Sequence, residues 1–178
     1  GSNWTAYTIG EKIVLSNEGD KVYFRNTSES TTLFSKDINN YYYFHMEGEI
    51  CASGDTTTLL NKNGTNTLSD WCFVKLFYDV EKRWDEEIDN TSLKTAPELP
   101  ATILADYCYC GMFSSCTSLT AAPALPATTL AEYCYSDMFS GCTKLSSLNV
   151  SFTAWHENAT NGWLKNAGKD VSGTKKFT

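Results

Sequence analysis

The sequence lacks the features that mark several common functional classes. No apolar run approaches the roughly 18 consecutive residues that a membrane-spanning helix needs. Basic residues are scarce, with 14 Lys and Arg against 21 Asp and Glu and a formal net charge of −7. Nucleic acids and anionic membranes bind basic surfaces, because their phosphate groups are negative. We therefore expect no nucleic-acid partner and no membrane span.

Catalytic and cofactor motifs are also missing. The chain contains no Gly-rich phosphate loop, no G-x-S-x-G and no H-E-x-x-H. Its two histidines, His45 and His156, are expected to be structural, because a cysteine–histidine dyad needs an activated thiol in an open, electropositive site. The carboxylates of residues 85–89 lack a cleft that would separate their pKa values. We predict no enzymatic activity and no cofactor; an unrecognised hydrolase is the least favoured alternative.

The strongest positive signal is an internal repeat. Residues 96–119 and 122–145 are identical at about 17 of 24 aligned positions, with an offset of about 26 residues. This period falls in the range of leucine-rich repeats. A more divergent copy lies at residues 68–77 and is followed by an insertion at residues 80–89. Because insertions in solenoids fall on loops, the charged run in this insertion is expected at the surface, as a solvated helical turn or loop.

Within each copy, apolar residues recur at every fourth position, as in Leu104, Cys108, Met112 and Cys116. This spacing predicts one face of a short helix. Pro123 excludes a long central strand. Each unit is therefore expected to be a short extended stretch, a proline turn and a short helix, and stacking is expected because one unit cannot bury both of its flanks.

These observations predict an α+β fold. It consists of a short leucine-rich-repeat stack of about three repeats of ~26 residues, with an N-terminal antiparallel β-domain and a C-terminal cap. The predicted regions are the β-domain at residues 1–58, the repeats at 59–150, with the first copy degenerate, and the cap at 151–178.

The flanking regions carry weaker signals. Two apolar runs, residues 12–15 and 21–25, are separated by a turn sequence and predict a hairpin. The alternating run at residues 42–52 predicts a third strand. In the tail, residues 159–167 predict a short helix that ends at Gly168. No signal peptide is visible, and the opening residues look like the second arm of a hairpin, so the chain is expected to come from a longer one.

Seven cysteines are an odd number, so they cannot all pair within one chain. Those of the repeats are expected to face the core as a structural cysteine ladder: Cys72, Cys108, Cys116, Cys134 and Cys142. Helix axes pack about 8–10 Å apart, which exceeds the Cα–Cα distance of about 7 Å that a disulfide allows. We therefore favour reduced thiols over disulfides. Both are favoured over a metal site, because no C-x-x-C occurs and no histidine lies nearby in the sequence.

The run A-P-x-L-P-A-T-x-L-A-x-Y-C-Y-x-x-M-F-x-x-C-T-x-L resembles the leucine-rich repeats of BspA-like surface proteins, which are common in Bacteroides-type bacteria. The resemblance covers residues 60–150. A broader family pattern, C-x-x-L-x-x-x-x-L-P-x-x-L, is matched by Cys116, Leu119, Leu125, Pro126 and, one place late, Leu130. The resemblance implies export to the bacterial cell surface and adhesion to host proteins or other bacteria. It implies no enzyme and supplies no fixed ligand residues.

Aromatic residues make up 13% of the chain and offer the best basis for binding. The candidate partner contacts are Tyr41, Tyr42, Tyr43 and Trp84, although we favour strand packing for at least one of the tyrosines. We predict an extracellular, monomeric, cell-surface binding or adhesion module whose partner is a host extracellular protein or a glycan. The alternative is a structural spacer or capping segment of a larger surface protein. A contiguous exposed aromatic patch would favour binding, and a smooth polar surface would favour the structural role.

Overall fold

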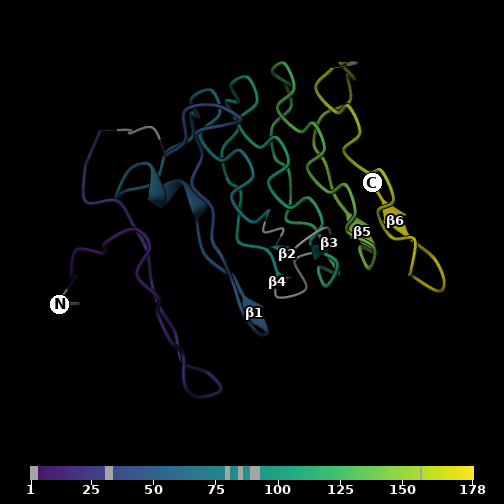
Figure 1. Ribbon diagram of the computed structural model, residues 1–178. Coiled ribbons are helices and arrows are strands. Elements are labelled where there is room, and N and C mark those ends of the chain that lie inside the picture. The colour runs from purple at the N-terminus through teal and green to yellow at the C-terminus, as the bar shows by residue number, and fades with distance from the viewer. Residues whose placement is uncertain (1–3, 31–33, 79–80, 84–85, 89–92, 157) are drawn as a thin grey trace.

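The chain forms a row of segments that lie side by side, from the N-terminal region to the C-terminus (Figure 1). This computed structural model describes residues 4–30, 34–78, 81–83, 86–88, 93–156 and 158–178. The one described helix is η1, a 3-10 helix at Thr56–Leu59. The strands form three pairs: β1 (Ile50–Cys51) with β4 (Leu93–Thr95) and β5 (Ser147–Leu148) with β6 (Lys176–Phe177), both parallel, and β2 (Glu81–Arg83) with β3 (Glu86–Ile88), antiparallel.

The predicted α+β class is wrong. The described residues contain no α-helix, so the strand-plus-helix units of a leucine-rich-repeat stack are absent. No antiparallel sheet forms in the described part of residues 1–58, where the predicted β-domain should lie, and its one strand, β1, pairs parallel with β4. The tail residues 159–167 form turns in place of the predicted helix. The insertion was expected to be a helical turn or loop, and it contains the antiparallel pair β2–β3.

The repeat segments consist of consecutive tight turns, which we call ribbons 1 to 4: residues 69–78, 105–116, 131–142 and 158–168. In ribbon 2, every second N–H group donates to the carbonyl three residues earlier, over 3.0–3.3 Å. The N–H groups between them donate to carbonyls of ribbon 3, over 2.7–3.0 Å. Ribbons 1 to 3 thus satisfy half of their amides locally and half on the next ribbon, as buried backbone requires.

The four-residue period explains why the helix prediction failed. An α-helix turns by about 100° per residue, so residues four apart drift by about 40° along its surface. In ribbon 2 a left-handed residue recurs at every fourth position, at Tyr107 (φ 58°), Gly111 (φ 62°) and Ser115 (φ 61°). Each left-handed residue reverses the local twist, which prevents a continuous right-handed helix. The same spacing that predicted one helix face therefore belongs to a chain of turns.

Two ladders of aromatic rings form the core between the ribbons. In one, Phe77, Phe113 and Phe139 stack at 5.4 and 5.6 Å between centroids. In the other, Tyr109 and Tyr135 stack at 6.0 Å. These rings are at most 5% exposed, and each contributes about 1.5–3 kcal/mol by burial.

The cysteine ladder lies in this core, as predicted. The five thiols of the ladder are buried, and all seven cysteines of the chain are free. The spacing argument for reduced thiols was wrong, because hydrogen-bonded ribbons lie beside the cysteines in place of packed helices. Two thiols donate to an earlier ribbon instead: Cys116 Sγ to the Phe77 carbonyl (3.4 Å) and Cys142 Sγ to the Phe113 carbonyl (3.0 Å).

The N-terminal segment covers the free side of ribbon 1. The Phe44 N–H donates to the Leu76 carbonyl over 2.9 Å, and the Phe44 ring stacks on Phe77 at 5.6 Å. Phe44 and Met46 are partly buried, whereas His45 and Glu47 are exposed, but of the strand predicted over residues 42–52 only β1 at Ile50–Cys51 forms. The first ribbon therefore has an aromatic cover. Among the described residues, no helix has the length and hydropathy to cross a bilayer.

Candidate binding surface

A row of half-exposed aromatic rings crosses the outer side of the ribbons. In each four-residue unit two side chains point into the core, as Cys108 and Tyr109 do, and the other two lie further out. Trp71, Tyr107 and Tyr133 occupy equivalent outer positions in ribbons 1 to 3. Their ring centroids are 3.9 and 4.7 Å apart, with interplanar angles of 5° and 12°. We call these three residues the aromatic ridge.

A row of carboxylates runs beside the aromatic ridge, at the position before each ring. Asp70, Asp106 and Glu132 are all exposed, and we call them the acidic row. The Asp106 N–H donates to Asp70 Oδ1 (3.1 Å), and the Glu132 N–H donates to Asp106 Oδ1 (3.0 Å). The acidic row thus helps to join the ribbons and also concentrates negative charge.

The stacking of the aromatic ridge limits what it can bind. Both faces of the Tyr107 ring are covered by its neighbours, as is one face each of Trp71 and Tyr133, so the ridge presents ring edges and the tyrosine hydroxyls along its length. Desolvation raises the pKa of the Tyr107 hydroxyl, and the neighbouring Tyr133 and Glu132 add to the shift. The hydroxyl therefore stays protonated at neutral pH and can donate a hydrogen bond. Together the two rows offer donors, apolar edges and negative charge, which suits a partner with cationic side chains.

The predicted tyrosine contacts lie at the N-terminal side of ribbon 1. Tyr42 and Tyr43 are each 50% exposed, and Tyr41 is partly buried. The Lys75 ammonium lies over the Tyr41 ring at 5.3 Å and over the Tyr78 ring at 5.1 Å, both within cation–π distance.

Packing engages these tyrosines as well. Tyr41 and Tyr43 lie at 5.9 Å, and Tyr42 meets Phe34 edge-on at 5.7 Å. Trp84, the fourth predicted contact, lies outside the described residues. The proposed contact role of all four residues stays a prediction.

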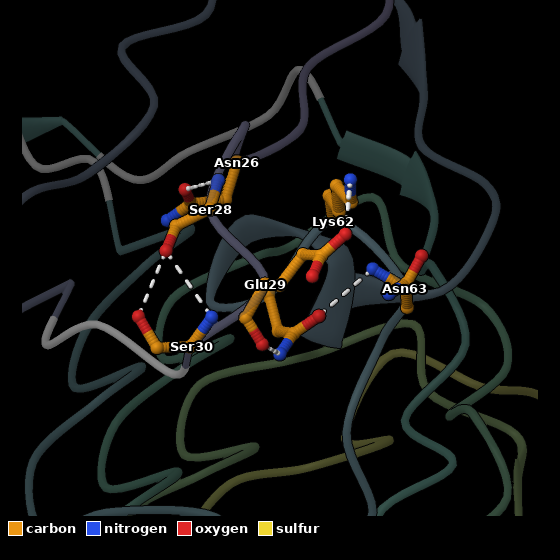
Figure 2. Close-up of polar contacts among 7 residues, drawn as sticks. Asn26, Ser28, Glu29, Ser30, Lys62 and Asn63 are labelled. Atoms are coloured by element: carbon orange, nitrogen blue, oxygen red, sulfur yellow. Dashed lines mark hydrogen bonds and ion pairs between the residues drawn. The ribbon is translucent and has the colours of Figure 1, made fainter.

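A polar cluster joins the N-terminal segment to the loop after η1 (Figure 2). Lys62 Nζ pairs with Glu29 Oε1 at 2.7 Å, and the Lys62 N–H donates to the Ser28 carbonyl at 2.8 Å. The Asn61 side chain donates to the Glu29 carbonyl. These contacts hold the N-terminal segment against the loop after η1.

An open hollow of about 310 Å³ lies beside this cluster. Its lining residues are Asp55, Asn63, Gly64, Thr65, Asn66 and Pro100. The Asp55 carboxylate already accepts hydrogen bonds from the Thr57 N–H (2.7 Å) and hydroxyl (2.6 Å). The Asn66 side-chain oxygen accepts from the N–H and hydroxyl of Thr102. Asp55 is engaged within a local turn and Asn66 bonds to Thr102, 36 residues away, so both polar groups of the hollow support the fold.

Four thiols of the ribbons are poorly suited to nucleophilic chemistry. Burial raises the pKa of Cys72 and Cys142 to about 12 and that of Cys110 and Cys134 to about 11. At neutral pH these groups are protonated, whereas the thiolate is the reactive form. Both histidines are exposed, and no group of three or more His, Cys, Asp and Glu side chains in the described part of the chain could hold a metal ion.

The sequence reasoning missed Trp71 and the acidic row as surface features. A signal was available: Trp71 aligns with Tyr107 and Tyr133, and Asp70 aligns with Asp106 and Glu132. No protein-family model, no curated protein and no solved structure matches the chain.

Proposed function

We propose that this chain is a non-catalytic binding module of a bacterial cell surface, and that its partner is a protein segment with Lys or Arg side chains. The observation that carries the proposal is the pairing of the aromatic ridge with the acidic row on one face. Aromatic side chains with polar tips are frequent anchors of protein interfaces. Carboxylates beside them favour basic partners and speed association.

A protein partner fits this face better than a glycan. Sugar rings commonly stack on an open aromatic face, and the inner faces of the aromatic ridge cover one another at 3.9 and 4.7 Å. The ring edges, hydroxyls and neighbouring carboxylates match extended basic peptides. The cell-surface location rests on the resemblance to BspA-like proteins. The raised thiol pKa values support a non-catalytic role.

The test is a binding screen of the purified chain against host matrix proteins, mucin and a glycan array. A saturable hit is then compared with the triple variant Asp70→Asn, Asp106→Asn and Glu132→Gln. Asn and Gln keep the oxygen that accepts each inter-ribbon hydrogen bond, so the variant removes charge while preserving the acceptors. We expect at least about ten-fold weaker binding, equal to about 1.4 kcal/mol, and a weaker dependence on salt.

The matched control neutralises three exposed carboxylates elsewhere: Glu18→Gln, Glu98→Gln and Asp170→Asn. It changes net charge by the same amount and should leave affinity within about two-fold. Equal loss in both variants would mean that only overall charge matters, and the proposed face would be rejected. A hit restricted to neutral glycans would reject the basic partner.

A structural spacer is the second candidate function. One end of the ribbon row bears unpaired backbone donors in ribbon 4, as described below, which is a feature of a segment that joins another. A folded chain that shows no saturable binding to any member of the screen would favour this role over the binding module.

A further inference from the structure

The two ends of the ribbon row differ in whether another segment covers them. At the N-terminal end, the Phe44 N–H satisfies the Leu76 carbonyl of ribbon 1, and Phe34 and Phe44 cover Phe73 and Phe77. At the C-terminal end lies ribbon 4, the last ribbon of the row (Figure 1). Nothing equivalent to Phe44 lies against it among the described residues. The row is therefore covered at one end and open at the other.

The open end presents a row of backbone donors. In ribbon 3 the N–H groups of Tyr135, Asp137, Phe139 and Gly141 donate to ribbon 4 over 2.8–2.9 Å. The equivalent N–H groups of ribbon 4 have no acceptor among the residues that the structure describes; they belong to Thr160, Gly162, Leu164 and Asn166. An ordinary strand edge alternates donors and acceptors, whereas this edge presents donors only. It needs a neighbour that supplies carbonyl groups.

The same end exposes apolar surface. Trp155 is 63% exposed and contacts Phe152 and Trp163 at 5.0 and 5.7 Å between ring centroids. Phe152 stacks on Tyr135, so these tryptophans continue an aromatic ladder of the core beyond ribbon 3. Trp163 and Leu164 are only partly buried. Inside the row, the next ribbon covers the backbone donors and the stacked rings of each ribbon. At the ribbon 4 edge, both are uncovered.

A second feature, with few backbone partners, lies at the opposite end of the chain; Lys12 pairs with Glu47 and Phe24 contacts Phe44, but the backbone of this segment bonds little. Residues 4–25 contain only two backbone hydrogen bonds among the described residues, and both close turns: Glu11 N–H to the Thr8 carbonyl and Asp20 N–H to the Asn17 carbonyl. Val14 and Tyr23 are each 69% exposed. Residues 4–25 thus offer free carbonyls and apolar side chains. These are the groups that can accept from the donors of the ribbon 4 edge and cover its exposed rings. Extended segments of this kind commonly add to an open edge of another chain.

We propose that copies of this chain associate head to tail, with residues 4–25 of one copy bound along the ribbon 4 edge of the next. The two features lie at opposite ends of the row in Figure 1, so one molecule offers both halves of a contact to different neighbours. A contact between two different surfaces forms open chains unless the rotation closes a ring. This proposal departs from the monomer that the sequence suggested, and it does not depend on the binding partner proposed above.

The test measures mass against protein concentration by sedimentation velocity. We compare a head variant, Val14→Glu with Tyr23→Glu, a tail variant, Trp155→Glu, and a control, Ile103→Glu. Ile103 is 54% exposed and lies between ribbons 1 and 2 in sequence, away from both ends. We expect the natural chain and the control to grow in mass with concentration, and each end variant to remain monomeric.

An equimolar mixture of the head and tail variants is the decisive sample. It contains one intact tail and one intact head, so it should form a dimer and nothing larger. A natural chain that is monomeric at every concentration overturns the proposal, as does a control that fails to associate. A mixture without dimer also overturns it, because the two ends would then not bind each other.

Hydrogen exchange provides a readout that needs no variant. The amides of Thr160, Gly162 and Leu164 should exchange rapidly in dilute solution and slowly at high concentration. Those of Tyr135 and Phe139 should be protected in both, since they bond to ribbon 4 within one copy. Rapid exchange of the ribbon 4 amides at every concentration would contradict the proposed edge.

Discussion

Ribbons 1 to 4 and residues 4–25 are both rich in aromatic and aliphatic side chains, but they use them differently. In ribbon 2, Phe113 is fully buried and stacks between two equivalent rings. In the N-terminal segment, Tyr23 is 69% exposed. The backbone differs in the same way, because the alternate amides of ribbons 1 to 3 bond to the next ribbon, whereas the only backbone bonds described within residues 4–25 close turns.

This difference shows what repetition contributes. A ribbon has a neighbour with the same spacing of donors, acceptors and rings, so every inter-ribbon bond forms in register with the others. The segment 4–25 has no such neighbour in the described chain, and its apolar residues find few partners. Apolar content alone therefore does not make a core; a surface of matching period must lie against it.

Alkaline pH should destabilise the ribbons far more than residues 4–25, and this is the largest effect that we expect. Buried thiols occur in ribbons 1 to 3, and burial raises the pKa of Cys72 and Cys142 to about 12 from the usual 9.0. Above pH 9 the unfolded chain loses these protons first, so it binds fewer protons than the folded chain and stability falls as pH rises. Each buried thiol should contribute a loss of about 1.4 kcal/mol per pH unit. The buried tyrosines act in the same direction.

The measurement is the urea midpoint at pH 8, 9 and 10. Cys142→Ala provides the control, because a chain with one buried thiol fewer should lose stability less steeply with pH. A midpoint that stays constant up to pH 10 would show that the thiols are not desolvated in the folded chain.

Truncation of a ring should be the next largest effect. Phe113→Ala removes the centre of a ladder and should lower the free energy of unfolding by about 3–5 kcal/mol. Tyr23→Ala removes an exposed ring and should change it by less than about 0.5 kcal/mol. Both changes are to be measured by urea denaturation. Similar losses in the two variants would show that residues 4–25 are packed in solution, and the contrast between the regions would fail.

Removal of a buried hydroxyl should give a small effect of the opposite sign. The hydroxyls of Tyr109 and Tyr135 are buried with no hydrogen-bond partner in the described structure. Burial of an unsatisfied polar group costs about 1–3 kcal/mol, so Tyr135→Phe should leave stability unchanged or raise it by about 1 kcal/mol. Tyr7→Phe removes an exposed hydroxyl that donates to the Glu11 carbonyl and should have almost no effect. A clear loss in Tyr135→Phe would reveal a bonded partner for this hydroxyl.

Part of the core could be predicted from the sequence, and part of the surface could have been. The aligned copies indicated that Cys108 and Cys134 are buried, and both are fully buried in the core. The same alignment places Asp70, Asp106 and Glu132 in one row, and this signal went unused. The predicted contacts Tyr41 to Tyr43 were chosen for their composition, and packing engages Tyr41 with Lys75.

The conformation inside each copy could not be predicted from spacing. A period of four residues fits one face of a helix over a short stretch, and it also fits a chain of turns. The left-handed positions carry Tyr107, Gly111 and Ser115 in ribbon 2, so only one of the three is the glycine that would signal a positive φ. For a residue such as Tyr107 the left-handed conformation costs about 1–2 kcal/mol. The neighbouring residues in the sequence give no sign of this conformation.

The sequence by itself determined the repeat, its offset of about 26 residues and which side chains recur, and these set the ladders of rings and thiols. Only the tertiary structure decided the backbone between them. A helix would satisfy each amide within its own segment, whereas the ribbons send alternate amides to a neighbour. The choice between these two patterns depends on a hydrogen-bonding surface on the adjacent segment. Such a surface exists only once the chain has folded, so it is not written in the local sequence.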